Sequence, residues 1–291
     1  MLTRDCFHVD PPFRELLAQA RLDSVARVLA AAGDRLAAWS RTSDTVFARL
    51  PGSMCSIFIK RYHYPRWPQR LRGMFRGTFF FASRARSEFR ALSLMRTLGI
   101  QGVRPIAFGE RRVAHFVRSC FLITEAVPNA IPLSTFIKTY SHRRGGRRLI
   151  KARRDILTSL ARQVRHMHDA GFVHRDLFWR NVLIRLLPDA QFEFYFLDAS
   201  VGRRIRLPQR RQDSIVRDIA AMAALSPDFC SRADQMRFLL EYLQTDRLTP
   251  EDRRWLRQVQ SQSVLLRDGE RQRLDRASVF DPPLSPAPEA L

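Results

Sequence analysis

Residues 172–198 constrain this chain more than any other part of its sequence. They contain His174-Arg175-Asp176, an asparagine at position 181, and then an aspartate, Asp198, in the sequence Leu-Asp-Ala-Ser. In this order, one carboxylate can accept the proton of a hydroxyl group, while an amide oxygen and a second carboxylate hold Mg²⁺ on nucleotide phosphates. The pattern predicts a phosphoryl-transfer site with Asp176 as the proton acceptor and Asn181 and Asp198 as metal ligands.

The alternative is that these are polar loop residues that cap strands and turns. An HRDxxxxN string rarely arises by chance, and the aspartate at the end of the following hairpin is an independent match. We therefore favour the functional interpretation. His174 and Arg175 are expected to support the loop rather than to react. His166 and His168 lie two positions apart on a predicted helix and face different directions, so we do not expect them to bind a metal together.

Composition indicates a folded chain with a strong positive charge. Of 291 residues, 45% are hydrophobic and 21 are Phe, which excludes a mostly disordered protein. No run approaches the roughly 20 apolar residues of a membrane span, and the N-terminus has no apolar core like that of a signal peptide, so we expect a cytoplasmic protein. The four cysteines are scattered, which fits reduced thiols.

The charge balance predicts an anionic partner. Fifty Lys and Arg against 28 Asp and Glu give a net charge of +22. Such an excess attracts nucleic acid, an anionic membrane surface or a phosphorylated glycolipid. A compositional bias in the genome would explain arginine in place of lysine, but not the excess of cations over anions.

The periodicity of apolar residues predicts an α+β chain. We expect a helical extension over 1–40, a small strand-rich lobe over 41–125, a larger helical lobe over 126–275 and a disordered, Pro-rich tail over 276–291. Within the small lobe, residues 45–60 read as a hairpin that ends at Lys60. A helix follows, with Ser87 as its N-cap, Glu88 in its first turn and Gly99 as its stop.

The catalytic-loop pattern resembles that of the protein-kinase-like fold. In that fold a strand lysine and a helix glutamate form a salt bridge that presents the ammonium group to the α- and β-phosphates, and Lys60 and Glu88 match them in order. The competing interpretation is a surface lysine at a strand end and a glutamate favoured by the helix dipole. The downstream motif favours the salt bridge.

Residues 45–245 resemble the lipopolysaccharide kinase family. The resemblance rests on SIFIKRYHYP, RARSEFRALSLMRTLGIQGVRPIAFGERR, FLITEAVPNAIPLSTFI, HRDLFWRNVLI, YFLDAS and IVRDIAAMAAL. It implies a two-lobed protein-kinase-like fold, ATP with Mg²⁺ as cofactors, and a Kdo or heptose hydroxyl of the lipopolysaccharide inner core as the acceptor. It also implies that Glu125 and Val127 form the nucleotide-binding hinge and that Asp218 braces the catalytic loop. Asp218 as an exposed residue beside Arg217 is the alternative.

Three departures from regulated protein kinases bear on the substrate. No GxGxxG precedes Lys60, the metal-binding turn reads Asp-Ala-Ser, and no Ala-Pro-Glu follows it. Only about twenty residues separate Asp198 from Asp218, which is short for a segment that docks a peptide. This short segment argues against a protein substrate, but not against a small-molecule one.

A basic and aromatic stretch, residues 61–86, predicts contact with an anionic lipid surface, although core packing of its Phe residues is the alternative. We therefore expect a kinase that lies peripherally on the cytoplasmic face of the inner membrane and acts on the lipopolysaccharide core or a lipid A precursor. The alternatives are an atypical Ser/Thr kinase, another small-molecule kinase, and a non-catalytic basic binding protein. Nucleic acid is a less favoured partner that the charge alone does not exclude. The acceptor sugar and its hydroxyl stay open.

Overall fold

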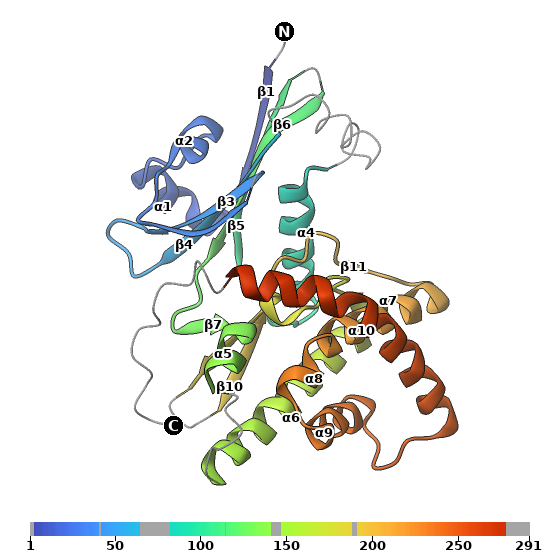
Figure 1. The fold of residues 1–291 in the computed structure, drawn as a ribbon. Helices are drawn as coiled ribbons and strands as arrows, with labels where there is room; N and C mark the ends of the chain where they lie inside the picture. The colour runs from blue at the N-terminus through green and yellow to red at the C-terminus, as the bar shows by residue number, and fades with distance from the viewer. Residues whose placement is uncertain are drawn as a thin grey trace. The chain divides into compact units, whose positions relative to one another are not determined.

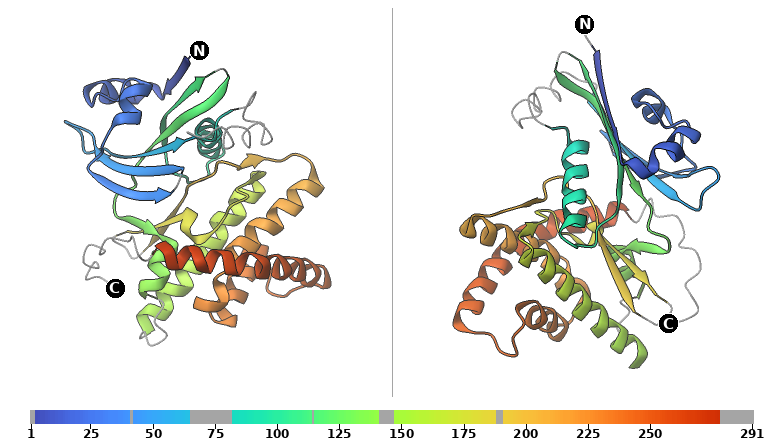
Figure 2. Two further views of the ribbon diagram at one scale, coloured as in Figure 1. Left: turned by 45° about the horizontal axis from the view of Figure 1, so that its top comes forward. Right: turned by 180° about the vertical axis from the view of Figure 1, so that it is seen from behind.

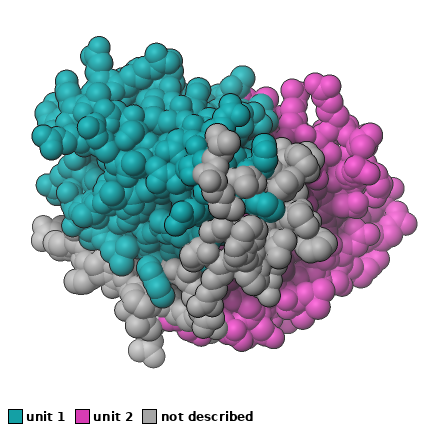
Figure 3. Space-filling view, turned by 90° about the horizontal axis from the view of Figure 1, so that it is seen from above, with its two compact units in different colours: residues 1–97, 103–127 teal, residues 98–102, 128–291 magenta. Residues whose placement is uncertain are grey.

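The computed structural model describes residues 3–40, 42–64, 82–113, 115–140, 147–187 and 191–277 (Figure 1). The chain divides into two compact units, residues 1–97 with 103–127 and residues 98–102 with 128–291 (Figure 3). Unit 1 is rich in strands and unit 2 is mainly helical. The predicted α+β class with two lobes is therefore confirmed, with the division at residues 127 and 128 rather than 125 and 126.

Unit 1 is built on a six-stranded sheet in the order β1-β5-β6-β4-β3-β2, in which every neighbouring pair is antiparallel. The strands are β1 (Thr3–Val9), β2 (Arg35–Ser40), β3 (Ser43–Arg49), β4 (Ser56–His63), β5 (Pro105–Val113) and β6 (Phe116–Glu125). The predicted hairpin over 45–60 is β3 and β4, and its turn includes Gly52 at a φ of +68°, a conformation that glycine adopts without strain.

The expectation of a helical extension over 1–40 is wrong. Two short helices, α1 (Arg14–Gln19) and α2 (Val25–Ala30), lie between β1 and β2, and both of these strands belong to the sheet. The helical spacing of Leu17, Val25 and Val28 is real, but it extends only over the short helices. The alternation in β1 and β2 gives little signal, because these edge strands are mostly exposed.

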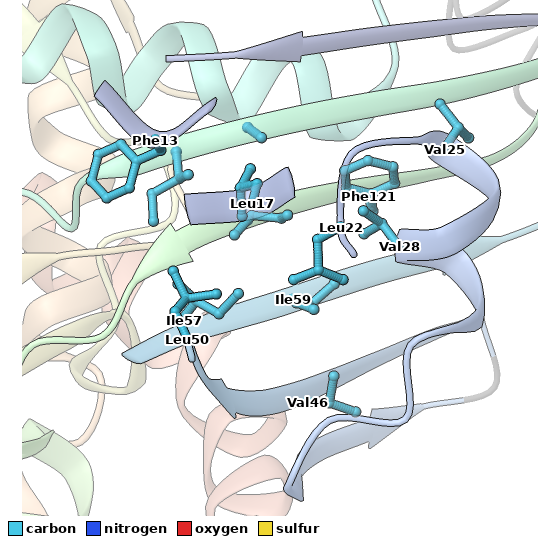
Figure 4. Close-up of a cluster of buried hydrophobic side chains, with 13 residues drawn as sticks. Phe13, Leu17, Leu22, Val25, Val28, Val46, Leu50, Ile57, Ile59 and Phe121 are labelled. Carbon is cyan, nitrogen blue, oxygen red and sulfur yellow. The ribbon is translucent and has the colours of Figure 1, made fainter. Parts of the chain in front are cut away.

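Alternation along β4 separates the two faces of the sheet. Ile57 and Ile59 are fully buried in a cluster with α1 and α2 (Figure 4). Lys60 and Tyr62 contact Glu88 of α4 (Arg84–Thr97), which packs on β5 and β6. Figure 2 shows α1 and α2 on one side of this sheet and α4 on the other. Successive strand residues point to opposite faces, so one strand supplies both the core and the charged pair.

Helix α4 begins at Arg84, four residues before the start predicted from an N-cap at Ser87. Ser83 caps it, because its hydroxyl accepts a hydrogen bond from the Arg86 backbone N–H at 3.1 Å and its carbonyl accepts one from Ser87 at 2.9 Å. Ser87 is therefore not the N-cap, and Glu88 lies in the second turn. Gly99 follows the helix with a φ of +70°, as predicted for its stop.

Unit 2 places the catalytic-loop sequence between helices and short strands. Its elements are β7 (Ala130–Pro132), α5 (Leu133–Tyr140), α6 (Arg147–Asp169), β8 (Phe172–Val173), the 3-10 helix η2 (Trp179–Asn181), β9 (Val182–Leu186), β10 (Phe192–Phe196), β11 (Arg203–Arg204), α7 (Pro208–Ala223), α8 (Ser226–Phe229), α9 (Arg232–Leu243) and α10 (Pro250–Ala277). Helix α6 packs on α9, and α7 packs on α10. Strands β9 and β10 form the second predicted hairpin. No helix in the described part of the chain is long and apolar enough to cross a membrane.

Two expectations fall wholly or partly outside the described residues. The predicted disordered tail over 276–291 lies there almost entirely, as do residues 65–81 of the basic and aromatic stretch. The described residues at the start of that stretch are engaged within unit 1. The Arg61 Nε donates to Asp44 at 2.8 Å, and Tyr62 is 2% exposed. Neither side chain is available to a lipid surface.

Candidate functional site

Lys60 and Glu88 form the predicted salt bridge in unit 1. The Lys60 Nζ lies 3.4 Å from Glu88 Oε2, and the Tyr62 hydroxyl donates to the same oxygen at 3.3 Å. The Glu88 side chain is only 4% exposed, whereas that of Lys60 is 22% exposed. A buried carboxylate therefore holds an ammonium group that still reaches solvent, which is the arrangement needed to present a cation to phosphates.

The predicted hinge begins where β6 ends. The Glu125 backbone N–H donates to the Arg104 carbonyl at 2.9 Å, and the Ala126 N–H donates to the Ser56 carbonyl at 2.8 Å. Unit 1 ends at the next residue, Val127. The backbone of Glu125 is thus fixed by its neighbours just before the chain passes into unit 2.

Asp176 and Asn181 are joined directly in the loop that follows β8. The Asn181 Nδ2 donates to the Asp176 backbone carbonyl at 2.8 Å and to Asp176 Oδ2 at 3.0 Å. Asn181 is 3% exposed and ends the 3-10 helix η2, while the Asp176 side chain is 30% exposed. The amide fixes the carboxylate through its nitrogen while the carboxylate stays accessible to a substrate hydroxyl.

Asp198 follows β10 with a φ of +56°, a left-handed conformation that is uncommon outside glycine but that Asp adopts more readily than most other residues. The residue before it, Leu197, ties this turn to the catalytic loop. The Leu197 N–H donates to the Asn181 carbonyl at 3.0 Å, and its carbonyl lies 3.0 Å from His174 Nε2. The structure thus brings the loop and the turn that contains Asp198 together through His174, a residue that was expected to have a supporting role.

Asp218 lies in α7 and is fully buried. Its Oδ2 accepts a hydrogen bond from the His174 backbone N–H at 2.7 Å, and its Oδ1 accepts one from the Arg175 N–H at 2.6 Å. The alternative of an exposed Asp218 is wrong. The carboxylate holds Arg175 at a φ of +65°, directly before Asp176.

The sequence analysis did not predict that His168 and Tyr242 support Asp218. His168 Nε2 lies 3.3 Å from Asp218 Oδ2, and its Nδ1 lies 2.8 Å from the Tyr242 hydroxyl. Burial raises the pKa of Tyr242 above its ordinary range. His168 carries no motif, and a histidine on an amphipathic helix offers no sign that it will be buried against an aspartate 50 residues later.

Two further contacts were also missed. Arg180 reaches both carboxylate oxygens of Asp176 at 3.3 Å, and its other terminal nitrogen contacts Glu270 of α10. Its guanidinium also lies over the Phe178 ring, 4.2 Å from the centroid. The only available signal for Arg180 was its place inside HRDxxxxN, and Glu270 had none.

Arginines gather in the segment after Asp198. Arg203 and Arg204 form β11, which pairs with β8 just before the catalytic loop. Burial, together with the nearby guanidinium groups of Arg203 and Arg217, lowers the pKa of Arg175. Among the described residues, no carboxylate forms an ion pair with Arg203, Arg204 or Arg217. All three side chains are exposed.

The side chains of Asn181 and Asp198 fit a magnesium ion bound together with a nucleotide. An amide oxygen and a carboxylate are hard oxygen ligands, and nucleotide phosphates and water complete the octahedral shell that Mg²⁺ requires. Both hydrogen bonds of the Asn181 amide to Asp176 use its nitrogen, which leaves its oxygen for the metal. Within the described ranges, no group of three or more His, Cys, Asp and Glu side chains forms a protein-only metal site.

Unit 2 also contains an apolar cavity of about 580 Å³. Helices α5, α6, α7, α9 and α10 contribute to its lining, which includes Leu133, Leu160, Met222, Leu239 and Val259. Cys230, after α8, lies at the same cavity, and burial raises the pKa of its thiol to about 11. A cavity of this size and lining suits an apolar ligand.

The fold and these two groups of side chains are typical of the protein-kinase-like class. Within it, the chain belongs to the lipopolysaccharide kinase (Kdo/WaaP) family, whose model matches residues 52–242. Similar proteins include the lipopolysaccharide core heptose(I) kinases WaaP of Pseudomonas aeruginosa, 27% identical over 54% of this chain, and of Escherichia coli, 26% identical over 43% of it. These matches cover 59% and 48% of the relatives' lengths.

A solved structure supports the fold over nearly the whole chain. The structure "WaaP in complex with acyl carrier protein" covers 92% of this chain and 99% of that chain, with a TM-score of 0.62 and 21% sequence identity. The family resemblance expected from the sequence is thus confirmed. At this level of identity the structural match establishes the fold.

Proposed function

We propose that this protein transfers the γ-phosphate of ATP to a sugar hydroxyl of the lipopolysaccharide inner core. Family membership supports the substrate class, and the matched relatives from Pseudomonas aeruginosa and Escherichia coli, which are named as heptose(I) kinases, favour heptose over Kdo. The observation that carries the proposal is the Asp176–Asn181 pair. One amide fixes the carboxylate that would accept the hydroxyl proton, and its free oxygen suits the metal on the phosphates.

In this proposal each side chain has a separate task. Lys60, held by Glu88, binds the α- and β-phosphates, and the backbone of Glu125 and Val127 binds the adenine. Asn181 and Asp198 would hold Mg²⁺, which supplies charge neutralisation on the phosphates when bound. Asp176 accepts the proton of the attacking hydroxyl group and orients it.

The arginines after Asp198 supply binding sites for an anionic acceptor. Arg203 and Arg204 are exposed on β11, one strand away from the chain that leads into Asp176. Inner-core sugars and lipid A carry carboxylates and phosphates, and a guanidinium binds these groups in bidentate geometry. The protein would then act peripherally at the cytoplasmic face of the inner membrane, where such an acceptor is anchored.

Site variants test this assignment. Purified protein is given ATP, Mg²⁺ and deacylated core lipopolysaccharide, and phosphate transfer is compared between wild type, Asp176→Ala and Asp198→Ala. We expect both variants to lower turnover by about two to four orders of magnitude, because each removes a group that acts on the reacting atoms. Unchanged melting temperatures control for folding, and wild-type turnover in either variant would refute the site.

A second set of variants tests acceptor binding. Arg203→Gln with Arg204→Gln is expected to raise the KM for the core acceptor about tenfold and leave the KM for ATP unchanged, since two exposed charged contacts together contribute about 1.4 kcal/mol. Arg253→Gln, an exposed position on α10, serves as the matched control. An equal change in both KM values would contradict this role.

The apolar cavity suggests an acyl-bearing partner. Because the solved WaaP structure contains an acyl carrier protein, we propose that the cavity of unit 2 accepts the acyl chain of such a carrier. Native mass spectrometry of the purified protein with acylated and unacylated carrier tests this directly. Binding of the acylated form alone, abolished by Met222→Trp, supports the proposal, whereas equal binding of both forms contradicts it.

A further inference from the structure

Helix α10 reaches the catalytic loop through one ion pair. Glu270 contacts Arg180, and Arg180 in turn lies 3.3 Å from both oxygens of Asp176. The Glu270 side chain is 5% exposed and that of Arg180 is 28% exposed. A carboxylate on the C-terminal helix is therefore linked to the candidate proton acceptor by a single guanidinium.

The contacts of Arg180 fix the direction of its side chain. Its guanidinium lies over Phe178, 4.2 Å from the ring centroid, and Phe178 belongs to a buried cluster against which Leu266 of α10 packs. Without Glu270, a long and partly exposed arginine beside Asp176 would exchange between rotamers, and side-chain entropy would oppose any single position. With it, the guanidinium is held on three sides and stays beside the Asp176 carboxylate.

Burial of the Glu270 carboxylate explains why it pairs with Arg180. A carboxylate with 5% exposure is costly to leave without a partner, so Glu270 favours the conformation in which Arg180 faces it. Arg273 also lies near Glu270, but at 3.8 Å and with 61% of its side chain exposed, so Arg180 is the closer and better shielded partner. Helix α10 lies beyond residues 52–242, which the family model matches.

We propose that Glu270 is a positioning residue that holds Arg180 against Asp176 and so fixes the orientation of the proton acceptor. The inference rests on the proposed function, because it assigns Asp176 that task. Helix α10 is then part of the catalytic unit rather than only a cover for α7. A displacement of about 1 Å in a reacting group costs up to a hundredfold in rate, so a small shift of Asp176 has a measurable effect.

A double-mutant cycle tests the inference. Glu270→Ala is expected to lower kcat about tenfold and leave the KM for ATP unchanged, and Glu270→Gln, which retains a hydrogen-bond acceptor, is expected to lose less. If Glu270 acts through Arg180, the variant carrying both Arg180→Ala and Glu270→Ala is no slower than Arg180→Ala alone. Multiplied losses in the double variant, or an unchanged kcat in Glu270→Ala, would overturn the proposal.

Arg271→Gln is the matched control for loss of helix docking. Arg271 is the next residue on α10, and its Nε donates to Asp228 Oδ2 of α8 at 2.8 Å, an ion pair that includes neither Arg180 nor Asp176. We expect this variant to keep its kcat. If it loses as much activity as Glu270→Ala, the effect comes from docking of the helix, and the proposal is overturned.

Hydrogen exchange provides a readout that does not depend on the substrate. Backbone exchange over residues 174–181 is measured in wild type, Glu270→Ala and Arg271→Gln without nucleotide. Faster exchange in Glu270→Ala alone supports the positioning role, and equal exchange in all three contradicts it. If the wild type transfers no phosphate to any core acceptor, the proposed function fails, while this measurement still decides how Glu270 acts on the loop.

Discussion

The Asp218 carboxylate accepts a hydrogen bond at 2.7 Å from the backbone N–H of His174, a residue 44 positions earlier in the chain. The same carboxylate accepts the N–H of Arg175. Two successive backbone groups are thereby fixed just before Asp176. A charged acceptor with two oxygens suits this task, because each oxygen takes one N–H and both bonds are charge-assisted.

Asp218→Asn is expected to destabilise unit 2 and to slow catalysis. The asparagine amide has one oxygen, so one buried N–H loses its acceptor and faces an NH₂ group, at a cost of about 2–3 kcal/mol in the free energy of unfolding. We expect kcat to fall at least tenfold, on the order expected for a displaced proton acceptor. Denaturant unfolding and phosphate transfer measure the two effects.

The control for this variant lies on the same helix. Asp213 is exposed on α7 and contacts only a neighbouring glutamine side chain among the hydrogen bonds of the described residues. Asp213→Asn should leave both quantities unchanged. Equal effects of the two substitutions would mean that a general change in α7, and not the loop contact, determines the result.

Lys60→Met is expected to lower turnover much more than it lowers the free energy of unfolding. Removing the ammonium group leaves Glu88 buried with the Tyr62 hydroxyl close by, so the free energy of unfolding should fall by about 1–3 kcal/mol. Turnover should fall about a hundredfold or more, because the cation on the α- and β-phosphates is lost. Lys151→Met, at an exposed position of α6, is the control, and equal turnover in the two variants would argue against the assignment of Lys60.

Cys230 provides a pH-dependent probe of the cavity. Burial raises the pKa of its thiol from 9.0 to about 11. At pH 7.5 a shift of two units leaves roughly a hundredfold less thiolate, the reactive form, so alkylation should be slow and should accelerate up to about pH 11. Mass spectrometry of a Cys6→Ser variant measures the rate. A plateau near pH 9 would contradict the shift.

The raised pKa of the Cys230 thiol also predicts that the free energy of unfolding falls at high pH. The folded state holds this proton more tightly than the unfolded state, so the contribution is fully present below about pH 9 and is lost as the pH rises through about 11. Cys230→Ala should therefore reduce the loss of stability between pH 9 and pH 11. Denaturant midpoints at the two pH values measure it.

Local sequence patterns predicted which helices and strands lie near the candidate site better than they predicted the residues at which those elements begin and end. The β3–β4 and β9–β10 hairpins, the stop of α4 at Gly99 and the contact between Lys60 and Glu88 follow from alternation, turn residues and motif order. The start of α4 at Arg84 did not, because Ser83 and Ser87 both suit an N-cap and only the tertiary structure selects Ser83.

Long-range contacts could not be predicted in the same way. His168 with Asp218, and Glu270 with Arg180, join residues 50 and 90 positions apart. Neither pair has a characteristic spacing, because the partners meet only after α6, α7 and α10 pack. The strands at 3–9 and 35–40 were missed for a related reason. Their side chains are largely exposed, so these strands have no apolar face that the sequence could reveal. They belong to the sheet because their backbones pair with β5 and β3.

The most direct test of the central claim is a comparison of acceptors. Transfer of labelled γ-phosphate from ATP with Mg²⁺ is measured to heptose-containing core lipopolysaccharide, to a core that ends at Kdo, and to a generic protein substrate, with Asp176→Ala as the control. We expect label on the heptose-containing core, and we expect it to disappear in Asp176→Ala. Label on the protein alone, or label on a sugar that persists without Asp176, would contradict it.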